Sequence, residues 1–423
     1  MSFNANRDLR LYLGASLLEN LCAQMLSVAV GWQIYAESRR PLDLGLVGLV
    51  QLVPSLGLAL PAGHLADRFD RARVVALSNL VMAACATALF AIASTGGAHL
   101  AAVYAALFFV SAARAFGGPA GQALLPDLVS FEDLQRAVTL SGAAWQLATI
   151  AGPALGGLIA GAAGPRWVYA GSAALLGLGA ALACAIRAPG ASTSAEGHGE
   201  GERAAWSTVL AGFRYIRTNR VILESISLDL FAVLLGGATA LLPVYASDVL
   251  HVGATGLGLL QGAPAAGAAG MALVLSYRPI ERRAGPILLG CVGVFGVATM
   301  VFAVSSRLWL SLAALVVLGA ADMVSVVARS TVVQLRTPPA MRGRVSAVSM
   351  MFIGGSSELG ALESGLTAAL LGAVPAVLLG GAGTLAVVAA FALFSKLRAV
   401  DRLDGPAKES PAGDAAPRPR SSS

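Results

Sequence analysis

Twelve long apolar segments restrict the fold of this chain more than any other feature of its sequence. A helix needs about 20 apolar residues to cross the hydrocarbon core of a bilayer. Only 12% of the 423 residues are charged, compared with about 25% in soluble domains. We therefore expect an all-α, polytopic membrane protein with twelve transmembrane helices. The segments cover residues 11–36, 44–62, 74–95, 99–122, 138–162, 167–186, 221–246, 255–276, 286–305, 308–333, 345–369 and 374–395.

The first six and the last six segments share a pattern, which predicts two similar halves. Residues 48–57 of the second segment match residues 258–267 of the eighth in their Gly, Gln and Pro positions. A shift of six segments preserves the direction of insertion, so the pattern indicates two six-helix bundles related by a parallel pseudo-repeat. The expected parts are an N-terminal bundle (1–187), a cytoplasmic linker (188–213), a C-terminal bundle (214–395) and a disordered cytoplasmic tail (396–423).

The distribution of Lys and Arg predicts the orientation in the membrane. With the N-terminus in the cytoplasm, 23 of the 29 basic residues fall in cytoplasmic segments. The outer loops then hold only four, Arg39, Arg40, Arg166 and Arg307. Basic residues accumulate on the cytoplasmic side of membrane proteins, so both termini are expected there. Because these residues are spread over short loops, the net charge of +6 does not indicate a nucleic-acid partner. The expected surroundings are the lipid bilayer.

A charged loop joins the second and third segments. It carries Gly63, Asp67, Arg68, Arg71 and Arg73. Glycine lets two helices approach closely, the aspartate can cap a helix or pair with an arginine, and the arginines hold the loop in the cytoplasm. We interpret the loop as part of a cytoplasmic gate. The alternative is a solvated, positively charged turn without a further role.

Charged side chains inside the apolar segments are the candidates for function. Each costs roughly 2.5–3.5 kcal/mol to insert, so it faces the bundle interior or water. The candidates for proton coupling or for lining a cavity are Glu19, Arg114, Asp322 and Glu358; Asp229, Arg329 and Glu363 also lie within segments. Apolar surroundings favour the neutral form of a carboxyl group, which lets it exchange protons near neutral pH. The alternatives are a structural, hydrogen-bonded Glu19 and an Arg114 that reaches the membrane surface.

The fifth segment contains Gly152-Pro153-Ala-Leu-Gly156-Gly157. Proline removes a backbone donor and bends a helix, and glycines let a neighbouring helix pack against the bend. Such a bend can serve as a hinge or seal when a protein alternates between two openings. The alternative is close helix packing alone.

Nothing in the sequence indicates an enzyme, a cofactor or a metal site. The four cysteines lie in apolar segments without metal-ligand spacing, and the four histidines lie in loops or at segment ends. A phosphate-binding Gly-rich loop ending in Lys-Ser/Thr is missing from the sequence. We therefore expect a non-enzymatic protein without cofactor or metal.

The charged loop resembles the signature loop of the major facilitator superfamily, Gly-x-Leu-Ala-Asp-Arg-x-Gly-Arg-Arg/Lys-x, although Asp70 stands where that loop usually has Gly. Over residues 7–395 the chain is similar to the twelve-span drug–proton antiporter branch, which includes enterobactin and macrolide exporters. The residues from Arg114 to Gly118 resemble the Arg-x-x-x-Gly motif of drug–proton antiporters. The Gly-Pro-x-x-Gly-Gly string resembles the signature of exporters. Further matching stretches are Leu124–Val129, Ala211–Arg214 and Gln334–Val345.

The resemblance implies a secondary active transporter of a bacterial cytoplasmic (inner) membrane. It implies export of a small hydrophobic drug or a siderophore, driven by proton entry through alternating access. The expected partners are a small-molecule substrate and protons, and a single chain is expected to function as a monomer. Two alternatives stay open: import of a small metabolite, and a non-transporting sensor or scaffold with the same fold.

Overall fold

The computed structural model describes residues 7–58, 69–95, 99–187, 211–278, 280 and 283–395. Every regular element within these ranges is helical. Eleven helices are long and apolar enough to cross a membrane, and one shorter apolar helix, Pro41–Gly57, completes a set of twelve. The predicted all-α architecture is confirmed. The linker 188–213 falls mostly outside the described residues, and the tail 396–423 falls wholly outside them.

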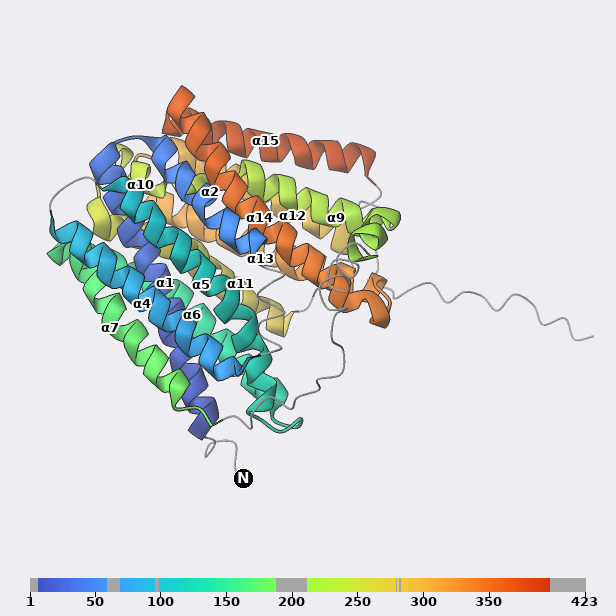
Figure 1. Ribbon diagram of the computed structural model, residues 1–423. Helices are drawn as coiled ribbons and strands as arrows, with labels where there is room; N and C mark the ends of the chain where they lie inside the picture. Colours follow the sequence, from blue (N-terminus) through green and yellow to red (C-terminus); the bar gives the residue numbers. More distant parts are fainter. Residues whose placement is uncertain are drawn as a thin grey trace, which may run out of the picture.

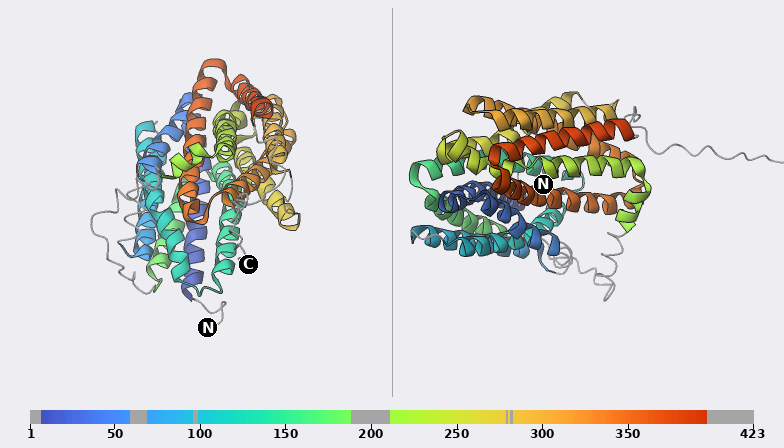
Figure 2. Two further views of the ribbon diagram at one scale, coloured as in Figure 1. Left: turned by 90° about the vertical axis from the view of Figure 1, so that its right-hand side faces the viewer. Right: turned by 90° about the horizontal axis from the view of Figure 1, so that it is seen from above.

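The helices form two groups along the chain. The first group contains α1 (Arg7–Ser38), α2 (Pro41–Gly57), α4 (Arg71–Ser94), α5 (Leu100–Asp127), α6 (Leu134–Ala163) and α7 (Pro165–Cys184). The second contains α9 (Arg220–Leu235), η2 (Ala238–Leu241), α10 (Leu242–Val244), η3 (Tyr245–Val249), α11 (Gly253–Tyr277), α12 (Ala284–Val304), α13 (Leu308–Arg336), α14 (Pro339–Leu371) and α15 (Ala373–Phe394). Within the first group α4 packs on α7 and α5, and within the second α13 packs on α11 and α12. Figure 1 and the view from above in Figure 2 show the cool-coloured and warm-coloured groups side by side.

The seventh predicted span, 221–246, is a single helix in the sequence analysis but an interrupted one in the structure. Helix α9 ends at Leu235, and the chain continues through Gly236 and Gly237 into η2, α10 and η3. Both residues are glycines, and neighbouring helices occupy the space that a Cβ atom would need. A Cβ on Gly236 would lie 2.5 Å from a Phe295 ring atom, and a Cβ on Gly237 would lie 2.6 Å from the Gly360 carbonyl oxygen. The helix breaks where α12 and α14 approach its backbone.

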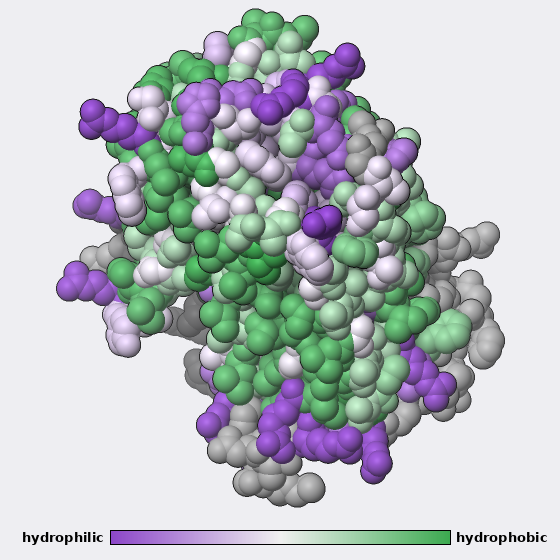
Figure 3. All heavy atoms as spheres, turned by 90° about the vertical axis from the view of Figure 1, so that its left-hand side faces the viewer, coloured by the Kyte–Doolittle hydropathy of each residue, from purple (hydrophilic) through white to green (hydrophobic). Residues whose placement is uncertain are grey.

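The surface is as apolar as the sequence predicts. Large side chains such as Leu77, Phe109 and Leu273 are more than half exposed. Figure 3 shows one face on which hydrophobic side chains cover a broad middle zone, while hydrophilic side chains gather near the top and along the lower edge. Exposed apolar area of this extent is unfavourable in water and favourable against lipid chains. The molecule is a multi-pass membrane protein.

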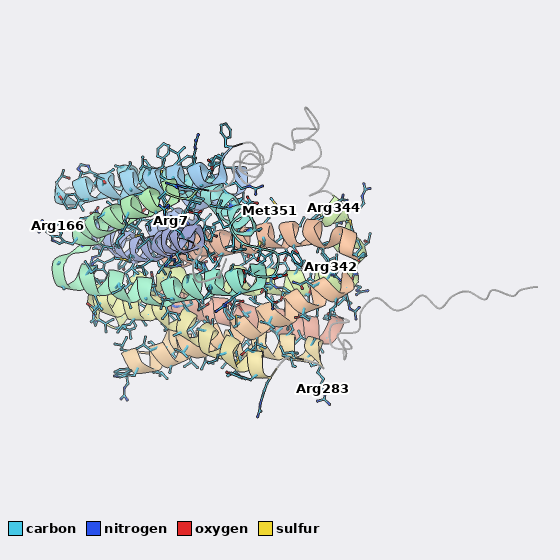
Figure 4. The ribbon with its side chains drawn as sticks, turned by 90° about the horizontal axis from the view of Figure 1, so that it is seen from below. Arg7, Arg166, Arg283, Arg342, Arg344 and Met351 are labelled. Carbon is cyan, nitrogen blue, oxygen red and sulfur yellow. The ribbon has the colours of Figure 1, made fainter. Side chains whose placement is uncertain are left out.

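The two ends of the molecule differ in charge. We name them the Arg7 end, where α1 begins, and the Arg39 end, where the chain turns from α1 into α2. Because successive spans alternate in direction, the starts of α12 and α14 return to the Arg7 end and the start of α7 lies at the Arg39 end. Figure 4 shows Arg283, Arg342 and Arg344 on the side away from Arg166, with Arg7 between them in this view from below.

Tight turns at the Arg39 end repeat between the two groups. Gly164 connects α6 to α7 with φ of 94°, and Gly372 connects α14 to α15 with φ of 90°. A positive φ in this range strongly favours glycine. Each glycine amide donates a hydrogen bond to the helix that it ends, at 3.0 Å to Ala160 and 2.9 Å to Ala368. Corresponding turns in corresponding places support the pseudo-repeat.

Candidate functional site

A central space lies between the two groups of helices. It consists of two cavities of about 880 and 920 Å³. Gln24, Gln51, Trp145 and Glu358 line both, so the cavities adjoin. The first follows α1 toward the Arg7 end as far as Tyr12, and the second lies between α2 and α6 of one group and α11 and α13 of the other.

The structure brings together the four ionisable residues that the sequence singled out. Glu19 and Arg114 line the first cavity, Asp322 lines the second, and Glu358 lines both. The Arg114 guanidinium attracts the carboxylates of both Glu19 and Glu358 electrostatically. One cation from the first group therefore faces an acid from each group. Glu363 instead accepts a hydrogen bond from Thr367 on its own helix, at 2.9 Å.

The placement of Arg114 follows from local packing of α5 on α4. Gly117 lies one turn further along α5, and a Cβ there would meet Ser78 Oγ at 2.5 Å and approach Glu19 Oε1 at 4.0 Å. Ser78 Oγ donates a hydrogen bond to the Ala113 carbonyl at 2.7 Å. The absence of a side chain at Gly117 lets α4 approach, and the hydrogen bond fixes α5 at the level where Arg114 faces the cavity.

A buried ion pair lies behind Asp322. Arg329 Nη1 of α13 donates to Asp229 Oδ2 of α9, and these side chains are 4% and 6% exposed. Asp322 interacts electrostatically with both members. The sequence analysis placed all three charges inside the bundle but did not identify this pair. Its members are 100 residues apart, so neither spacing nor periodicity could have revealed it.

The helix groups contact each other at the Arg39 end through a polar cluster. Tyr35 Oη donates to Asp248 Oδ2. Arg39 Nη1 donates to Ser247 Oγ at 2.9 Å and pairs with Asp248 Oδ1 at 3.3 Å. We call Tyr35, Arg39, Ser247 and Asp248 the Arg39-end latch. It connects the end of α1 to η3, so the cavity is closed at this end by contacts between the groups.

Two helix crossings also join the groups, and glycines form both. A Cβ on Gly157 of α6 would lie 2.6 Å from Gly258 Cα of α11, and a Cβ on Gly48 of α2 would lie 2.9 Å from Ala361 Cβ of α14. Gly48 and Gly258 are the positions that the sequence repeat matches. The same kind of close approach therefore occurs at two related places.

The Gly-Pro-x-x-Gly-Gly string lies where α6 contacts two helices. A Cβ on Gly152 would meet Gln24 Cβ of α1 at 2.6 Å, and a Cβ on Gly156 would meet Met25 Cα at 3.0 Å. Pro153 lies inside α6, which stays continuous from Leu134 to Ala163. The string thus packs α6 against α1 on one side and, through Gly157, against α11 on the other.

The charged loop between α2 and α4 is described only in part. Gly63, Asp67 and Arg68 lie outside the described residues. Arg71 Nη1 pairs with Asp127 Oδ2 at 2.5 Å and donates to the Ala123 carbonyl at 3.0 Å, so it ties the start of α4 to the end of α5. Arg73 Nε lies 3.4 Å from Asp70 Oδ2.

Asp70 has a structural role of its own. Its Oδ1 accepts hydrogen bonds from the amides of Ala72 at 3.0 Å and Arg73 at 3.4 Å, and it is the N-cap of α4. Aspartate is among the preferred residues at this position. The departure from the usual glycine therefore supplies a cap for the third span.

The described residues contain neither a candidate metal site nor a disulfide bond. Within them, no group of three or more His, Cys, Asp or Glu side chains has the proximity needed to hold a metal ion. Cys22, Cys85, Cys184 and Cys291 are free thiols.

Comparison with known proteins adds three findings. A family model described as transmembrane secretion effector (MFS_3) matches residues 5–416. The enterobactin exporter EntS of Citrobacter koseri is 28% identical over 334 residues, which cover 77% of this chain and 76% of EntS. The multidrug efflux pump Tap of Mycolicibacterium fortuitum is 28% identical over 375 residues, which cover 84% of this chain and 88% of Tap.

The fold also resembles solved structures. A POT family transporter crystallised in complex with 5-aminolevulinic acid superimposes with a TM-score of 0.72. The match covers 94% of this chain and 98% of that chain at 11% sequence identity, so the likeness is one of fold.

Proposed function

This chain belongs to the transmembrane secretion effector family of major facilitator transporters, and on that basis we propose that it exports a small organic molecule in exchange for protons by alternating access. The observation that carries the proposal is the central cavity. Ionisable side chains of both helix groups line it, and the groups contact each other at the Arg39 end while the cavity follows α1 toward the Arg7 end.

The proposed orientation places the Arg7 end in the cytoplasm. The basic residues support this orientation, because 23 of the 29 Lys and Arg residues fall on that side and basic residues are retained in the cytoplasm. The structure then corresponds to a state that receives substrate from the cytoplasm or from the inner leaflet. We propose the bacterial cytoplasmic membrane as the location, with both termini cytoplasmic.

Proton coupling is proposed to rest on Glu19, Arg114, Asp322 and Glu358. A charged carboxylate attracts the Arg114 guanidinium, and protonation removes that attraction. Because Glu19 and Glu358 come from different groups, protonation of either one changes the electrostatic balance between the two groups. One proton that enters along the membrane potential supplies about 2.3 kcal/mol per 100 mV, which is enough to bias such an equilibrium.

Two elements are proposed to control access. The loop with Gly63, Asp67, Arg68, Arg71 and Arg73 acts as the cytoplasmic gate, and the Arg71–Asp127 ion pair supports a role in joining helices at that side. The string Gly152, Pro153, Gly156 and Gly157 acts as hinge and seal, which its contacts with α1 and α11 support. We expect a single chain to suffice, because helices of one chain line the whole cavity.

The substrate is proposed to be a small hydrophobic drug or a siderophore. EntS is named as an enterobactin exporter and Tap as a multidrug efflux pump, and both are similar to this chain over most of its length. Cavities of 880 and 920 Å³ have the size of sites that hold drug-sized ligands.

Proton-coupled efflux from inverted vesicles tests the proposal. Vesicles that contain the chain are energised, candidate lipophilic drugs and catecholate siderophores are added in turn, and a pH-sensitive dye reports proton movement. A substrate-dependent proton leak is expected for the unaltered chain and is expected to disappear in Glu19→Gln. Glu132→Gln is the matched control, because Glu132 is exposed and lines neither cavity.

Three results would contradict the proposal. Substrate movement that persists after the proton gradient has collapsed would remove proton coupling. Binding of a compound by folded protein, with no movement of that compound in either direction, would favour a sensor or scaffold. Uptake into right-side-out vesicles without efflux would favour an importer.

A further inference from the structure

We propose that the side-chain amides of Gln24, Gln51 and Gln261 recognise the substrate, and that this substrate is an organic cation with several hydrogen-bonding groups. The inference rests on the proposed function, because it specifies what occupies the same cavity. We call these three residues the amide cluster. Its members come from α1, α2 and α11, and all three line the second cavity.

The amide cluster has hydrogen-bonding capacity that the described part of the protein does not use. Two other glutamines of the bundle are occupied: Gln146 Nε2 donates to the Ala265 carbonyl at 3.0 Å, and Gln33 Nε2 donates to Glu37 at 2.8 Å. The amides of the cluster have no such side-chain hydrogen bond to any described residue. A primary amide offers two donors and two acceptor sites, so the cluster can bind hydroxyl, amine and carbonyl groups.

Two members of the cluster are related by the internal repeat. Gln51 and Gln261 occupy matching positions in the second and eighth spans, each three residues after the glycines of the helix crossings, Gly48 and Gly258. A substrate in the second cavity therefore meets an amide from each half. A ligand shifts the balance between two arrangements of the halves only if it binds one arrangement better than the other, and contact with both halves makes its affinity depend on their arrangement.

The charge of the second cavity specifies the sign of the substrate. Asp322 and Glu358 line it, and its described lining contains no Lys, Arg or His. Arg114 lines only the first cavity, and Arg329 is occupied by Asp229. An ammonium group can pair with either carboxyl group once that group has released its proton, whereas a carboxylate-bearing substrate would find no cation in the described lining. The lining favours a cation over an anionic catecholate.

The amide and carboxyl side chains of the second cavity lie at different depths along the membrane normal. Gln51 and Gln261 lie about 15 and 12 Å from the helix ends at the Arg39 end, at 1.5 Å per residue. Asp322 and Glu358 lie roughly 20 Å from that end, near mid-depth. Apolar side chains such as Phe295 complete the wall. The geometry points to an amphipathic molecule whose positive group lies near mid-depth and whose hydrogen-bonding groups extend toward the closed end.

Three fluorescent probes, each of which carries one dansyl group, distinguish the contribution of charge to binding from that of hydrogen bonding. The first is a dansyl amino-polyol, which carries an amine and several hydroxyls. The second is a dansyl alkyl trimethylammonium, which carries the positive charge alone. The third is a dansyl polyol carboxylate, which carries the hydroxyls and a negative charge. Fluorescence anisotropy with the purified full chain gives the dissociation constant of each, and the amino-polyol is expected to bind most tightly.

Substitution of the glutamines tests whether their amides bind the hydroxyl groups of the probe. Gln51→Met and Gln261→Met keep the side-chain size and remove hydrogen bonding. Each is expected to weaken binding of the amino-polyol by roughly 3- to 10-fold and to leave binding of the trimethylammonium probe within about 2-fold. Glu358→Gln is expected to weaken both cationic probes. Gln135→Met is the matched control, because Gln135 is exposed and lies outside both cavities.

The trimethylammonium probe also reports folding, since a misfolded variant loses it as well. If a methionine variant fails to fold, Gln51→Asn and Gln261→Asn test the same amides at shorter reach, with the same expected order of probes. Equal weakening of both cationic probes in a variant that unfolds at the wild-type temperature, or tightest binding of the polyol carboxylate, would overturn the inference.

Measurements of binding and of transport distinguish a failure of this inference from a failure of the proposed function. If the probes bind in the expected order but none moves with protons in vesicles, the amide cluster stands and the exporter proposal fails. If a lipophilic drug moves with protons equally well in the wild type and in both methionine variants, and the variants bind all three probes like the wild type, the exporter proposal stands and the amide cluster fails.

Discussion

Asp229 and Arg329 form the most deeply buried charge pair among the described residues. Both side chains are less than a tenth exposed, and they connect α9 to α13 behind the cavity-lining Asp322. Removing one member of a buried pair leaves the other charge unpaired in an apolar region, which costs far more than removing both. The pair therefore fixes the position of the interrupted seventh span.

We expect Asp229→Asn to destabilise the protein by about 3–5 kcal/mol, because Arg329 loses its carboxylate partner. Thermal unfolding of the purified protein in detergent measures the change. The double variant Asp229→Asn/Arg329→Gln is the control, and it should recover most of the lost stability. Equal destabilisation in the single and double variants would show that the charges do not stabilise each other.

The sequence identified the charged residues of the site but not all of their partners. Glu19, Arg114 and Glu358 were predicted because a charge in an apolar segment has to face the interior, and the structure brings them to one cavity. The pairing of Asp229 with Arg329 joins distant segments, so it depends on how the helices pack. Gln51 and Gln261 occupy matching positions in the sequence repeat. A neutral amide, unlike a charge, does not have to face the bundle interior, so the repeat alone did not identify them as site residues.

At the scale of helices, α6 and α11 approach each other through backbone atoms. Gly157 and Gly258 face each other, and the absence of side chains allows the crossing. The related crossing of α2 and α14 uses Gly48. Contacts of this kind depend on van der Waals packing, which is the main attraction between helices in lipid.

We expect Gly258→Ala to separate α6 from α11 at the Arg39 end, because its Cβ would be 2.8 Å from Gly157 Cα. Overpacking of this kind costs about 1–3 kcal/mol. Spin labels on α6 and α11 should report a longer distance, and thermal stability should fall. Gly270→Ala on the same helix is the control, since a Cβ there would meet no atom within 4 Å. Unchanged distances in Gly258→Ala would contradict a seal at this crossing.

Most helices could be predicted from the sequence, because length and hydropathy suffice to identify a membrane span. The seventh span is confirmed as a candidate membrane span, Arg220–Val249, but its helix is interrupted after Leu235. Gly236 and Gly237 are visible in the sequence, but glycines are common in membrane helices. What distinguishes these two is the close approach of Phe295 and Gly360, which is a property of the folded chain.

At the scale of the whole molecule, the latch and the crossings hold the two groups together at one end. The latch includes Arg39, which has a left-handed backbone with φ of 54°. The Arg39 side chain is 63% exposed and the Asp248 side chain 43% exposed, so water reaches these contacts and they can break and re-form. An opening toward the Arg39 end requires the latch to separate.

We expect a short bifunctional maleimide that joins Arg39→Cys to Ser247→Cys to stop transport while substrate binding continues. The crosslink keeps the Arg39 end closed, and the cavity stays accessible from the other side. Efflux in vesicles and probe binding on the same preparation measure the two effects. Each single variant treated with the same reagent is the control. Continued efflux in the crosslinked protein would show that this end does not open during transport.

The crossings and the cavity share residues but use different atoms: Gly48, Glu358 and Ala361 line the second cavity, and the Glu358 carbonyl oxygen is the atom that lies nearest to a Cβ on Gly48. Main-chain atoms make the closest contacts at the crossings, whereas side chains such as Gln51, Asp322 and Glu358 define the cavity surface. Substitution of a cavity side chain such as Gln51 or Asp322 therefore leaves the main-chain contacts of the crossings in place. During evolution, such a protein can change its substrate through a few point mutations while the contacts between its moving parts stay the same. Selection by a new toxic compound would act first on the cavity-lining positions.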